Sequence, residues 1–341
     1  MNILKQKLVF FNRTNQLVPR QLQGLFLFGC HTLALQNIVS IRSNARSYVT
    51  NFNTAKSKAY RLLANPRWLT IFPQLLGRLG LVSVTSRVAL DFSTFGRFQI
   101  LAFAVQTRLG RALPVYFEII TYPITEDSQN IFICEAIERF VTAVCCRPKL
   151  VMDRGFACPY ILKHLAQLSH LFLVRIKAMK TLTNEEKKLI FQAQYSPEND
   201  LLVHVYEHDL RLVVSDDPGN GNQPWYLITN DVVSVRGGII ADYYHRFEIE
   251  EFFKDAKWLQ GLEHLRVKKI RSMSVVLWFV ILGWWCMALL ERDTPVVQGE
   301  HPHDKLSYPR LISEALIREQ LAIVRQHLTV CMGGRKEVFY P

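Results

Sequence analysis

The chain of 341 residues is long enough for two or three domains, or for one large domain with an insertion, and its 49% hydrophobic content can build an extensive core. Lysine and arginine outnumber the acids by 41 to 29, and the resulting net charge of +12 favours an anionic polymer or an acidic surface as partner. The seven cysteines are odd in number and lack any CxxC pair, which argues against disulfides or a zinc ribbon and indicates the reduced thiols of a cytoplasmic protein.

Residues 1–80 predict a small, basic, helical N-terminal region. Apolar and basic positions alternate there with hardly any acid, and the cations include Arg13, Arg20, Arg42, Arg46, Lys56, Lys58, Arg61 and Arg67. Because charge runs are common on protein surfaces, two interpretations stay open: contact with DNA, or the solvated face of a capping helical layer. No signal peptide is expected, since Gln, Asn and Arg interrupt the first apolar residues.

From residue 86 the pattern changes to short apolar runs separated by turn signals. Three of these runs, SRVALDFSTF, FQILAFAVQT and ALPVYFEIIT, predict an antiparallel meander whose first strand ends near Asp91. A helical pattern over 131–146 and a buried strand over 148–156 follow, and then a helix over 158–168 and a strand over 170–177. The order βββαβαβ predicts an α/β fold with a mixed sheet of the ribonuclease-H-like arrangement and helices on its faces.

Residues 178–235 interrupt this order with β-like stretches and a turn rich in Gly, Asn and Pro. They are either a plain surface excursion or a β-rich insertion beside an active site. Their position just before a long helical pattern at 236–264 favours the insertion. The predicted catalytic core therefore comprises residues 81–177 and 236–292.

Residues 272–290 contain no charge, so their length meets the criterion for a membrane-spanning helix. We favour a buried helix instead, because the run follows the polar helical pattern by fewer than ten residues and a large α/β core can enclose a helix that is apolar on all sides. Residues 293–341 predict a C-terminal helical region with an amphipathic helix over 308–328.

The stretch YYHRFEIEEFFKDAK, residues 243–257, carries a spaced polar set. Tyr243, Arg246, Glu250 and Lys257 stand at offsets of 0, 3, 7 and 14, which fall at roughly 0°, −60°, −20° and −40° around a helix axis and so share one narrow face. The apolar residues of a separate stripe are Ile249, Phe252 and Ala256. The pattern predicts a helix with one buried face and one chemical face.

Three acids take comparable places: Asp91 in one strand, Asp153 at the end of another, and Glu250 on the helix. In the βββαβαβ order the first and fourth strands are neighbours, so the two aspartates can converge beneath the glutamate. Crowded carboxylates repel one another, and divalent cations relieve that repulsion. Hard oxygen ligands favour two Mg²⁺ or Mn²⁺ ions, the arrangement with which nucleases and polymerases cut phosphodiesters.

The remaining polar residues of the helical face suit a nucleic-acid backbone. Arg246 offers a planar fork to phosphate oxygens, Lys257 a point charge, and Tyr243 a hydroxyl donor. Each residue taken singly has a plainer explanation, since a strand-end Asp usually forms a turn and a lone helical Arg or Lys is usually solvated.

These residues resemble those of the DDE transposases of bacterial insertion sequences, in the group with a Tyr-x2-Arg-x3-Glu-x6-Lys signature. The signature is complete as Tyr243, Arg246, Glu250 and Lys257, and LDFST and VMDRGF resemble the segments that carry the two aspartates. The resemblance covers about residues 80–292. It implies Mg²⁺-dependent cutting and joining at element ends, with Asp91, Asp153 and Glu250 as metal ligands and the other three signature residues bound to DNA near the cleaved strand.

The resemblance also implies a use for Trp225, which begins the last β-like stretch of the insertion: stacking on a flipped DNA base. A core tryptophan is the alternative. The expected partners are double-stranded DNA, at element ends and target, and a second copy of the chain, in the cytoplasm near the nucleoid. Two rival functions are a non-catalytic DNA-binding descendant and a membrane protein that spans at 272–290.

Overall fold

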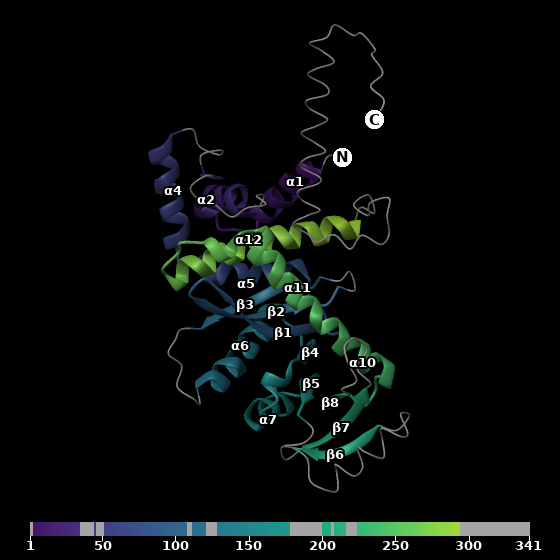
Figure 1. Cartoon of the computed structure of the whole chain (residues 1–341). Helices are drawn as coiled ribbons and strands as arrows, with labels where there is room; N and C mark the ends of the chain where they lie inside the picture. Colours follow the sequence, from purple (N-terminus) through teal and green to yellow (C-terminus); the bar gives the residue numbers. More distant parts are fainter. Residues whose placement is uncertain are drawn as a thin grey trace, which may run out of the picture.

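The computed structural model describes residues 3–34, 44–45, 51–107, 111–120, 128–177, 200–205, 208–215 and 224–293. It shows an α/β architecture in which one eight-stranded mixed sheet is surrounded by helices (Figure 1). The amphipathic helix predicted at 308–328, most of the C-terminal region, residues 178–199 and the cations Arg42 and Arg46 lie outside the described residues.

The sheet has the strand order β3-β2-β1-β4-β5-β8-β7-β6. Its strands are β1 Arg87–Phe95, β2 Phe98–Val105, β3 Leu113–Ile120, β4 Lys149–Met152, β5 Phe172–Ile176, β6 Leu201–Val205, β7 His208–Ser215 and β8 Trp225–Thr229. β1, β2 and β3 form the predicted antiparallel meander, and Gly96 makes the left-handed turn between the first two with a φ of 57°. β4 pairs in parallel with both β1 and β5.

The residues predicted as a β insertion contribute β6, β7 and β8. These strands continue the central sheet, because β8 pairs antiparallel with β5 and in turn carries β7 and β6. In Figure 1 they form the lower end of the molecule, below β5.

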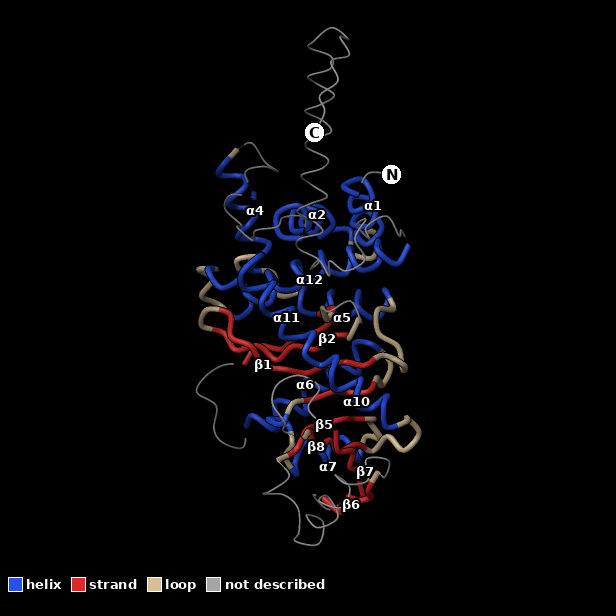
Figure 2. The backbone as a smooth tube through the Cα atoms, turned by 45° about the vertical axis from the view of Figure 1, so that its right-hand side comes forward, coloured by secondary structure: helices blue, strands red, loops and turns tan. Residues whose placement is uncertain are grey.

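Helices cover both faces of the sheet (Figure 2). Those that follow the N-terminal region are α6 Ser128–Val144, α7 Pro159–Gln167, α10 Arg236–Tyr244, α11 Glu248–Lys254 and α12 Ile270–Asp293. Alternate residues of a strand point to opposite faces. Accordingly Phe95 of β1 packs edge-on against Phe253 of α11, whereas Phe103, which lies opposite Leu90 on β2, stacks on Phe140 of α6. Asp91 shares the α11 face with Phe95.

The helix predicted over 236–264 is not continuous. A 3-10 turn, His245–Phe247, separates α10 from α11, and a π-helical turn, Asp255–Leu259, follows α11. Tertiary contacts override helical propensity here, because Arg246 and Asp255 are buried charged residues that must reach partners on other elements. The apolar stripe is confirmed: Ile249, Phe252 and Ala256 are all buried, with 0%, 6% and 0% exposure.

The N-terminal region is helical, as predicted, within the described residues. Its elements are α1 Ile3–Asn15, a 3-10 turn Arg20–Leu22, α2 Gln23–Gly29, a π-helical turn Cys30–Ala34, α4 Phe52–Ala64 and α5 Trp68–Leu79. The side chain of Asn51 caps α4 by accepting from the backbone of Asn53 and Thr54, and the indole of Trp68 donates to Leu62 O at 3.0 Å, which ties α5 to α4.

The apolar helix α12 lies between the N-terminal helices α1, α2 and α4 and the edge of the sheet at β3 (Figure 1). Among the described residues it is the one helix long and apolar enough to cross a membrane, yet 83% of its most apolar window is buried inside the protein. The indole of Trp285 donates to Pro114 O of β3 at 2.8 Å, and Trp278 packs on Tyr116 and Phe117 of the same strand. The helix thus covers a sheet edge that would otherwise be open.

Candidate functional site

The parallel pairing of β1 with β4 brings the two predicted aspartates together. Leu90 and Met152 form the last pair in the register, so Asp91 and Asp153 are the next residues of neighbouring strands. Asp91 Oδ1 accepts a hydrogen bond from the backbone N of Phe92 at 2.7 Å. Asp153 directly precedes the 3-10 turn Arg154–Phe156. The predicted convergence of the first and fourth strands is therefore observed.

Arg246 joins the third acid to the first. Its Nη2 donates to Glu250 Oε1 at 3.0 Å, and its Nη1 donates to Asp91 Oδ2 at 3.3 Å. The guanidinium is only 3% exposed, and it lies 4.5 Å from the centre of the Phe247 ring. Burial alone would lower the pKa of Arg246, but Tyr243 and the three acids raise it. The arginine is thus a buried cation held by the acid group.

The pKa of the Asp91 carboxyl reflects its burial first and its charged neighbours second. Burial raises the pKa of its carboxyl from 3.8 to about 6, with smaller opposing effects from Arg246 and the backbone N–H, and with further increases from Asp153 and Glu250. A carboxyl whose pKa responds to both other acids shares one electrostatic environment with them. Added positive charge at this position would stabilise the ionised form of Asp91.

Tyr243 lies under the second aspartate. It is fully buried, and its hydroxyl donates to Asp153 Oδ1 at 3.2 Å. Burial raises the pKa of this phenol to about 12, so it stays a donor at neutral pH. Trp225 packs edge-on against Tyr243 with ring centres 5.0 Å apart and is itself 6% exposed, so in this structure it supports the tyrosine from the core.

Lys257, in the π-helical turn after α11, lies beside the end of β1 and away from the acids. Its Nζ lies 5.7 Å from the centre of the Phe95 ring, and Phe95 follows Asp91 by four residues on the same face of the strand. The four signature side chains therefore do not meet at one point. They follow β1, with Tyr243 and Arg246 at the acids and Lys257 near the strand end.

Two of the three acids, Asp91 and Glu250, bond the Arg246 guanidinium, and Asp153 acts on it through its charge. In the part of the chain that the structure describes, no three His, Cys, Asp or Glu side chains form a group ready to hold a metal ion. The reason is visible in the contacts: Arg246 bonds both Asp91 and Glu250 and occupies the place between them. The donor chemistry nevertheless suits a hard divalent cation, because all three acids offer carboxylate oxygens.

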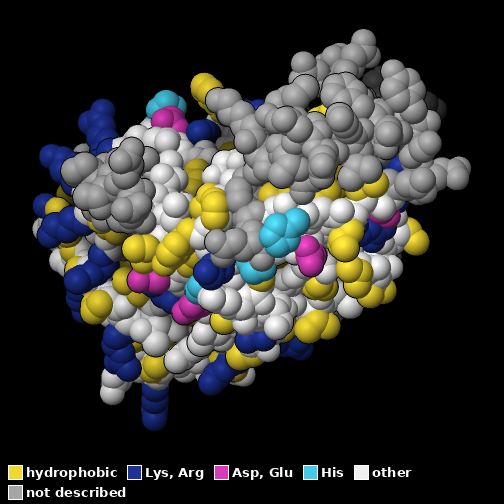
Figure 3. Space-filling model, turned by 90° about the horizontal axis from the view of Figure 1, so that it is seen from below, with side chains coloured by type: hydrophobic (Ala, Val, Ile, Leu, Met, Phe, Trp, Pro, Cys, Tyr) yellow, Lys and Arg dark blue, Asp and Glu magenta, His cyan; other side chains and the backbone are white. Residues whose placement is uncertain are grey.

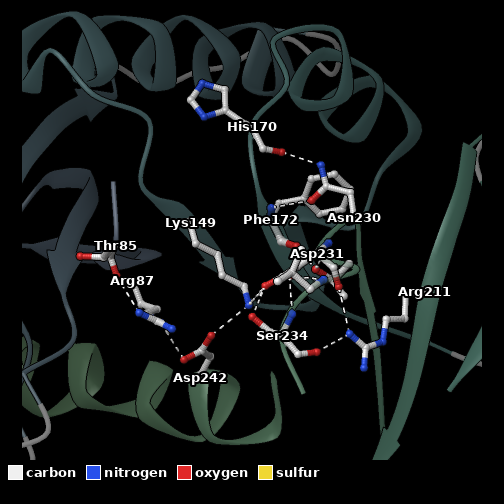
Figure 4. A network of polar contacts seen from close by, with 12 residues as sticks. Thr85, Arg87, Lys149, His170, Phe172, Arg211, Asn230, Asp231, Ser234 and Asp242 are labelled. Atoms are coloured by element: carbon white, nitrogen blue, oxygen red, sulfur yellow. Dashed lines mark hydrogen bonds and ion pairs between the residues drawn. The ribbon is translucent and has the colours of Figure 1, made fainter. Parts of the chain in front are cut away.

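A second network, which the sequence analysis missed, fixes α10 to the sheet (Figure 4). Lys149 at the start of β4 donates to Asp231 Oδ2 and to Asp242 Oδ2, both at 2.9 Å, and its side chain is 6% exposed. Arg87 of β1 holds the other oxygen of Asp242 at 3.0 Å. Burial opposes ionisation of Asp231, but hydrogen bonds from Ser234 and Lys149 lower its pKa below the ordinary value. Because Asp242 precedes Tyr243, the network sets the position of the tyrosine.

Two further acids anchor α11. Glu248 is buried, accepts from the backbone N of Thr107 at 2.9 Å and bonds His245 at 2.9 Å. Asp255 is paired with Arg111 at 3.0 Å. A sequence signal for these anchors existed: Glu248 and Asp255 are seven residues apart and fall on the helical stripe of the buried Phe252, so each needed a partner.

Basic side chains dominate part of the molecular surface. In the view from below, lysine and arginine gather along the left-hand edge, and acidic side chains are few among them (Figure 3). This distribution agrees with the net charge of +12 and suits a polyanion.

Comparison with known proteins finds similarity among solved structures only. No protein-family model matches the sequence, and no curated protein matches it. Among solved structures, the chain is similar to a piggyBac transposase determined by cryo-EM as a synaptic complex with hairpin DNA. The identity is 11%, the alignment covers 89% of this chain and 71% of that chain, and the TM-score is 0.47.

Proposed function

We propose that this chain is a metal-dependent DNA transposase of the DDE type. The observation that carries the proposal is the placement of Asp91 beside Asp153 at the ends of the β1–β4 pairing, together with the buried arginine that bonds both Asp91 and Glu250 of α11. The strand order β3-β2-β1-β4-β5, with its meander and parallel pairs, supports the ribonuclease-H-like core that this chemistry uses. The complete Tyr-Arg-Glu-Lys spacing adds to it.

The acid group fits Mg²⁺ or Mn²⁺. All its donors are carboxylates. Burial, with smaller additions from Asp153 and Glu250, raises the pKa of Asp91, and a divalent cation would offset that cost to the ionised form. Asp91, Asp153 and Glu250 would hold the ions. When bound, a pair of such ions makes water a stronger nucleophile at neutral pH and stabilises charge on the leaving oxygen.

The reaction has two displacements at phosphorus. In the first, a water oxygen bonds to phosphorus as the bond to the 3′ oxygen breaks and a proton passes to that oxygen, which leaves a 3′ hydroxyl on the element and a 5′ phosphate on the flanking DNA. In the second, that 3′ hydroxyl attacks a phosphodiester of target DNA and releases a target 3′ hydroxyl. Each displacement passes through added negative charge on the phosphoryl oxygens, which nearby cations stabilise.

The surrounding side chains have separate tasks in this proposal. Tyr243 orients Asp153 through its hydroxyl. Arg246 orients Asp91 and Glu250, and its guanidinium would also be able to donate to a phosphate oxygen of bound DNA. Lys257, near the end of β1, contacts the DNA backbone beside the cleaved strand. Stacking of Trp225 on a DNA base requires the ring to leave its place against Tyr243.

The proposed partners are double-stranded DNA and a second copy of the chain, because joining two element ends requires both to be held at once. The proposed location is the cytoplasm, at the nucleoid. The buried position of α12 supports a core role for that helix in place of a membrane span.

Cleavage of the DNA that flanks the gene tests the proposal. Purified chain with Mg²⁺ is expected to nick that DNA, and Asp91→Ala is expected to abolish nicking while electrophoretic mobility shifts show unchanged DNA binding. A matched control, Asp209→Ala, removes a carboxylate from the exposed end of β7. If the wild-type chain binds but never cuts, the non-catalytic descendant is the correct interpretation.

A further inference from the structure

A groove of about 1370 Å³ lies between α4 and the segment that connects the signature helices to α12. One wall is the stripe of α4 that carries Phe52, Lys56 and Tyr60, and the other is the chain from His264 to Ser272. The groove lies outside the acid group, and none of the three acids lines it.

The α4 wall combines a hollow floor with exposed rings. Ala55, Ala59 and Leu63 recur at helical spacing on the lining stripe, and the small alanine side chains leave the hollow. Tyr60 borders this floor with 66% of its surface exposed, and Phe52 borders it with 39%. Exposed aromatic rings beside an aliphatic floor offer a π surface to a ligand.

The opposite wall is basic for a reason that can be traced in the sequence. In the segment LRVKK, Leu265 and Val267 pack against the core, whereas Arg266 and Lys268 point to solvent. Lys269 and Arg271 follow and are also exposed. The alternation of buried apolar and exposed basic residues lines up the cations along the rim.

The charge of this groove has one sign. Together with Lys56, the four cations of the connector give five basic residues, and no Asp or Glu occurs among the described residues that line the groove. Within that same part of the chain none of the five forms an ion pair with an acid. A rim of this kind attracts a polyanion.

We infer that this groove binds an unpaired strand of DNA, with phosphates on the basic rim and bases against the ring of Tyr60. A groove that pairs cations with an accessible ring suits a single strand, because every base has a π face that a duplex keeps stacked inside. A duplex can reach the cations but cannot place its bases on the aliphatic floor. The groove is also continuous in the chain with Lys257, nine residues before Arg266, and Trp258 between them is 77% exposed.

The inference deepens the proposed function, on which its place in the reaction rests: the groove holds the strand that separates from its complement at a cut element end. Binding itself does not depend on catalysis. It can therefore be measured in EDTA, where no cleavage occurs, and judged apart from the acid group.

The experiment measures fluorescence anisotropy of the full chain with a labelled 15-nucleotide oligo(dT) and with a duplex of equal length. The single strand is expected to bind more tightly. Tyr60→Ala is expected to weaken single-strand binding about tenfold while leaving duplex binding unchanged, whereas Tyr60→Phe keeps the ring and the affinity.

The basic rim is tested by salt dependence. The logarithm of single-strand affinity falls by about 0.7 per neutralised phosphate against log salt, so Lys268→Ala with Lys269→Ala is expected to reduce the slope by about 1.4. Arg78→Ala, an exposed cation of α5 outside the groove, is the matched control with an unchanged slope.

Equal affinities of wild type and Tyr60→Ala for the single strand, or an equal loss for both DNA forms, would overturn the inference. Thermal melting of each variant shows whether the fold is retained, and the lysine double variant carries the test if Tyr60→Ala does not fold. Asp91→Asn is expected to bind the oligonucleotide like wild type. If single-strand binding depends on Tyr60 but the chain cuts no DNA, the inference about the groove is supported and the proposed transposase function is refuted. If the chain cuts DNA but single-strand binding does not depend on Tyr60, the proposed function is supported and the inference about the groove is refuted.

Discussion

The buried lysine of β4 offers a quantitative test of how α10 is held. Lys149→Met removes the cation that bonds Asp231 and Asp242, whose side chains are only 6% and 13% exposed. Removing one partner of a buried ion pair costs about 3 to 5 kcal/mol, because an uncompensated charge stays in the interior. Asp231 retains hydrogen bonds from Ser234. Much of the cost therefore falls on Asp242, whose carboxylate is left, among the described residues, with the partly exposed Arg87.

Urea unfolding followed by circular dichroism measures this loss, which corresponds to a drop of about 4 to 7 °C in the melting temperature of a chain of this size. Lys149→Met with Asp242→Asn is expected to recover part of it, since the second change removes the stranded charge. Arg139→Met is the comparison, because Arg139 pairs with Glu118 at a site where the arginine is 46% exposed, and such pairs contribute about 1 kcal/mol or less. If Lys149→Met costs no more than Arg139→Met, the argument from burial is wrong.

Three other predictions concern single residues. The folded-state pKa of Asp91 is raised from 3.8 to about 6, so wild-type stability falls as pH rises through that window. In urea titrations, the free energy of unfolding of Asp91→Asn minus that of wild type should rise by up to about 3 kcal/mol between pH 4 and 6. A difference that does not change with pH would contradict this. Tyr243→Phe removes the donor to Asp153 and should cost about 1 to 3 kcal/mol in the same assay, whereas no loss would mean that the bond is not formed. Gly283→Ala places a methyl 2.4 Å from Ala34 O and should cost about 1 to 3 kcal/mol; an unchanged melting temperature would show that α12 does not pack this closely on the N-terminal layer.

Much of the fold followed from local pattern. The alternating runs around Asp91 and the helical spacing over 131–146 predicted β1 and α6, and the strand order placed Asp91 beside Asp153. These features depend on short-range periodicity, which can be read from a single sequence, and on a strand order that is common among α/β folds. The burial of α12 was also predicted, from its position beside a polar helix.

Other features depend on partners that are remote in the chain. Lys149 meets Asp231 and Asp242 across 82 and 93 residues, and a lysine in an apolar run gives no sign that it is buried and paired. The division of the helix at 245–247 and 255–259 depends likewise on what Arg246 and Asp255 contact. The angular argument assumed a regular helix, so it could not foresee that Arg246 would turn into the acid group.

The joining of β8 to β5 was also hidden. The stretch 225–229 read as a strand, but pairing is decided by the partner's free edge, and that edge belongs to a strand some fifty residues earlier. Only the three-dimensional arrangement shows that the predicted insertion extends the main sheet.

The most direct test of the account is a Mn²⁺ titration followed by electron paramagnetic resonance of the free ion. The proposal predicts two bound ions per wild-type chain, and it predicts that Asp91→Asn, Asp153→Asn and Glu250→Gln each lose at least one of them. Two results would contradict the claim that these acids form a metal centre. Either the wild-type chain binds no Mn²⁺, or it binds Mn²⁺ and none of the three substitutions changes that binding.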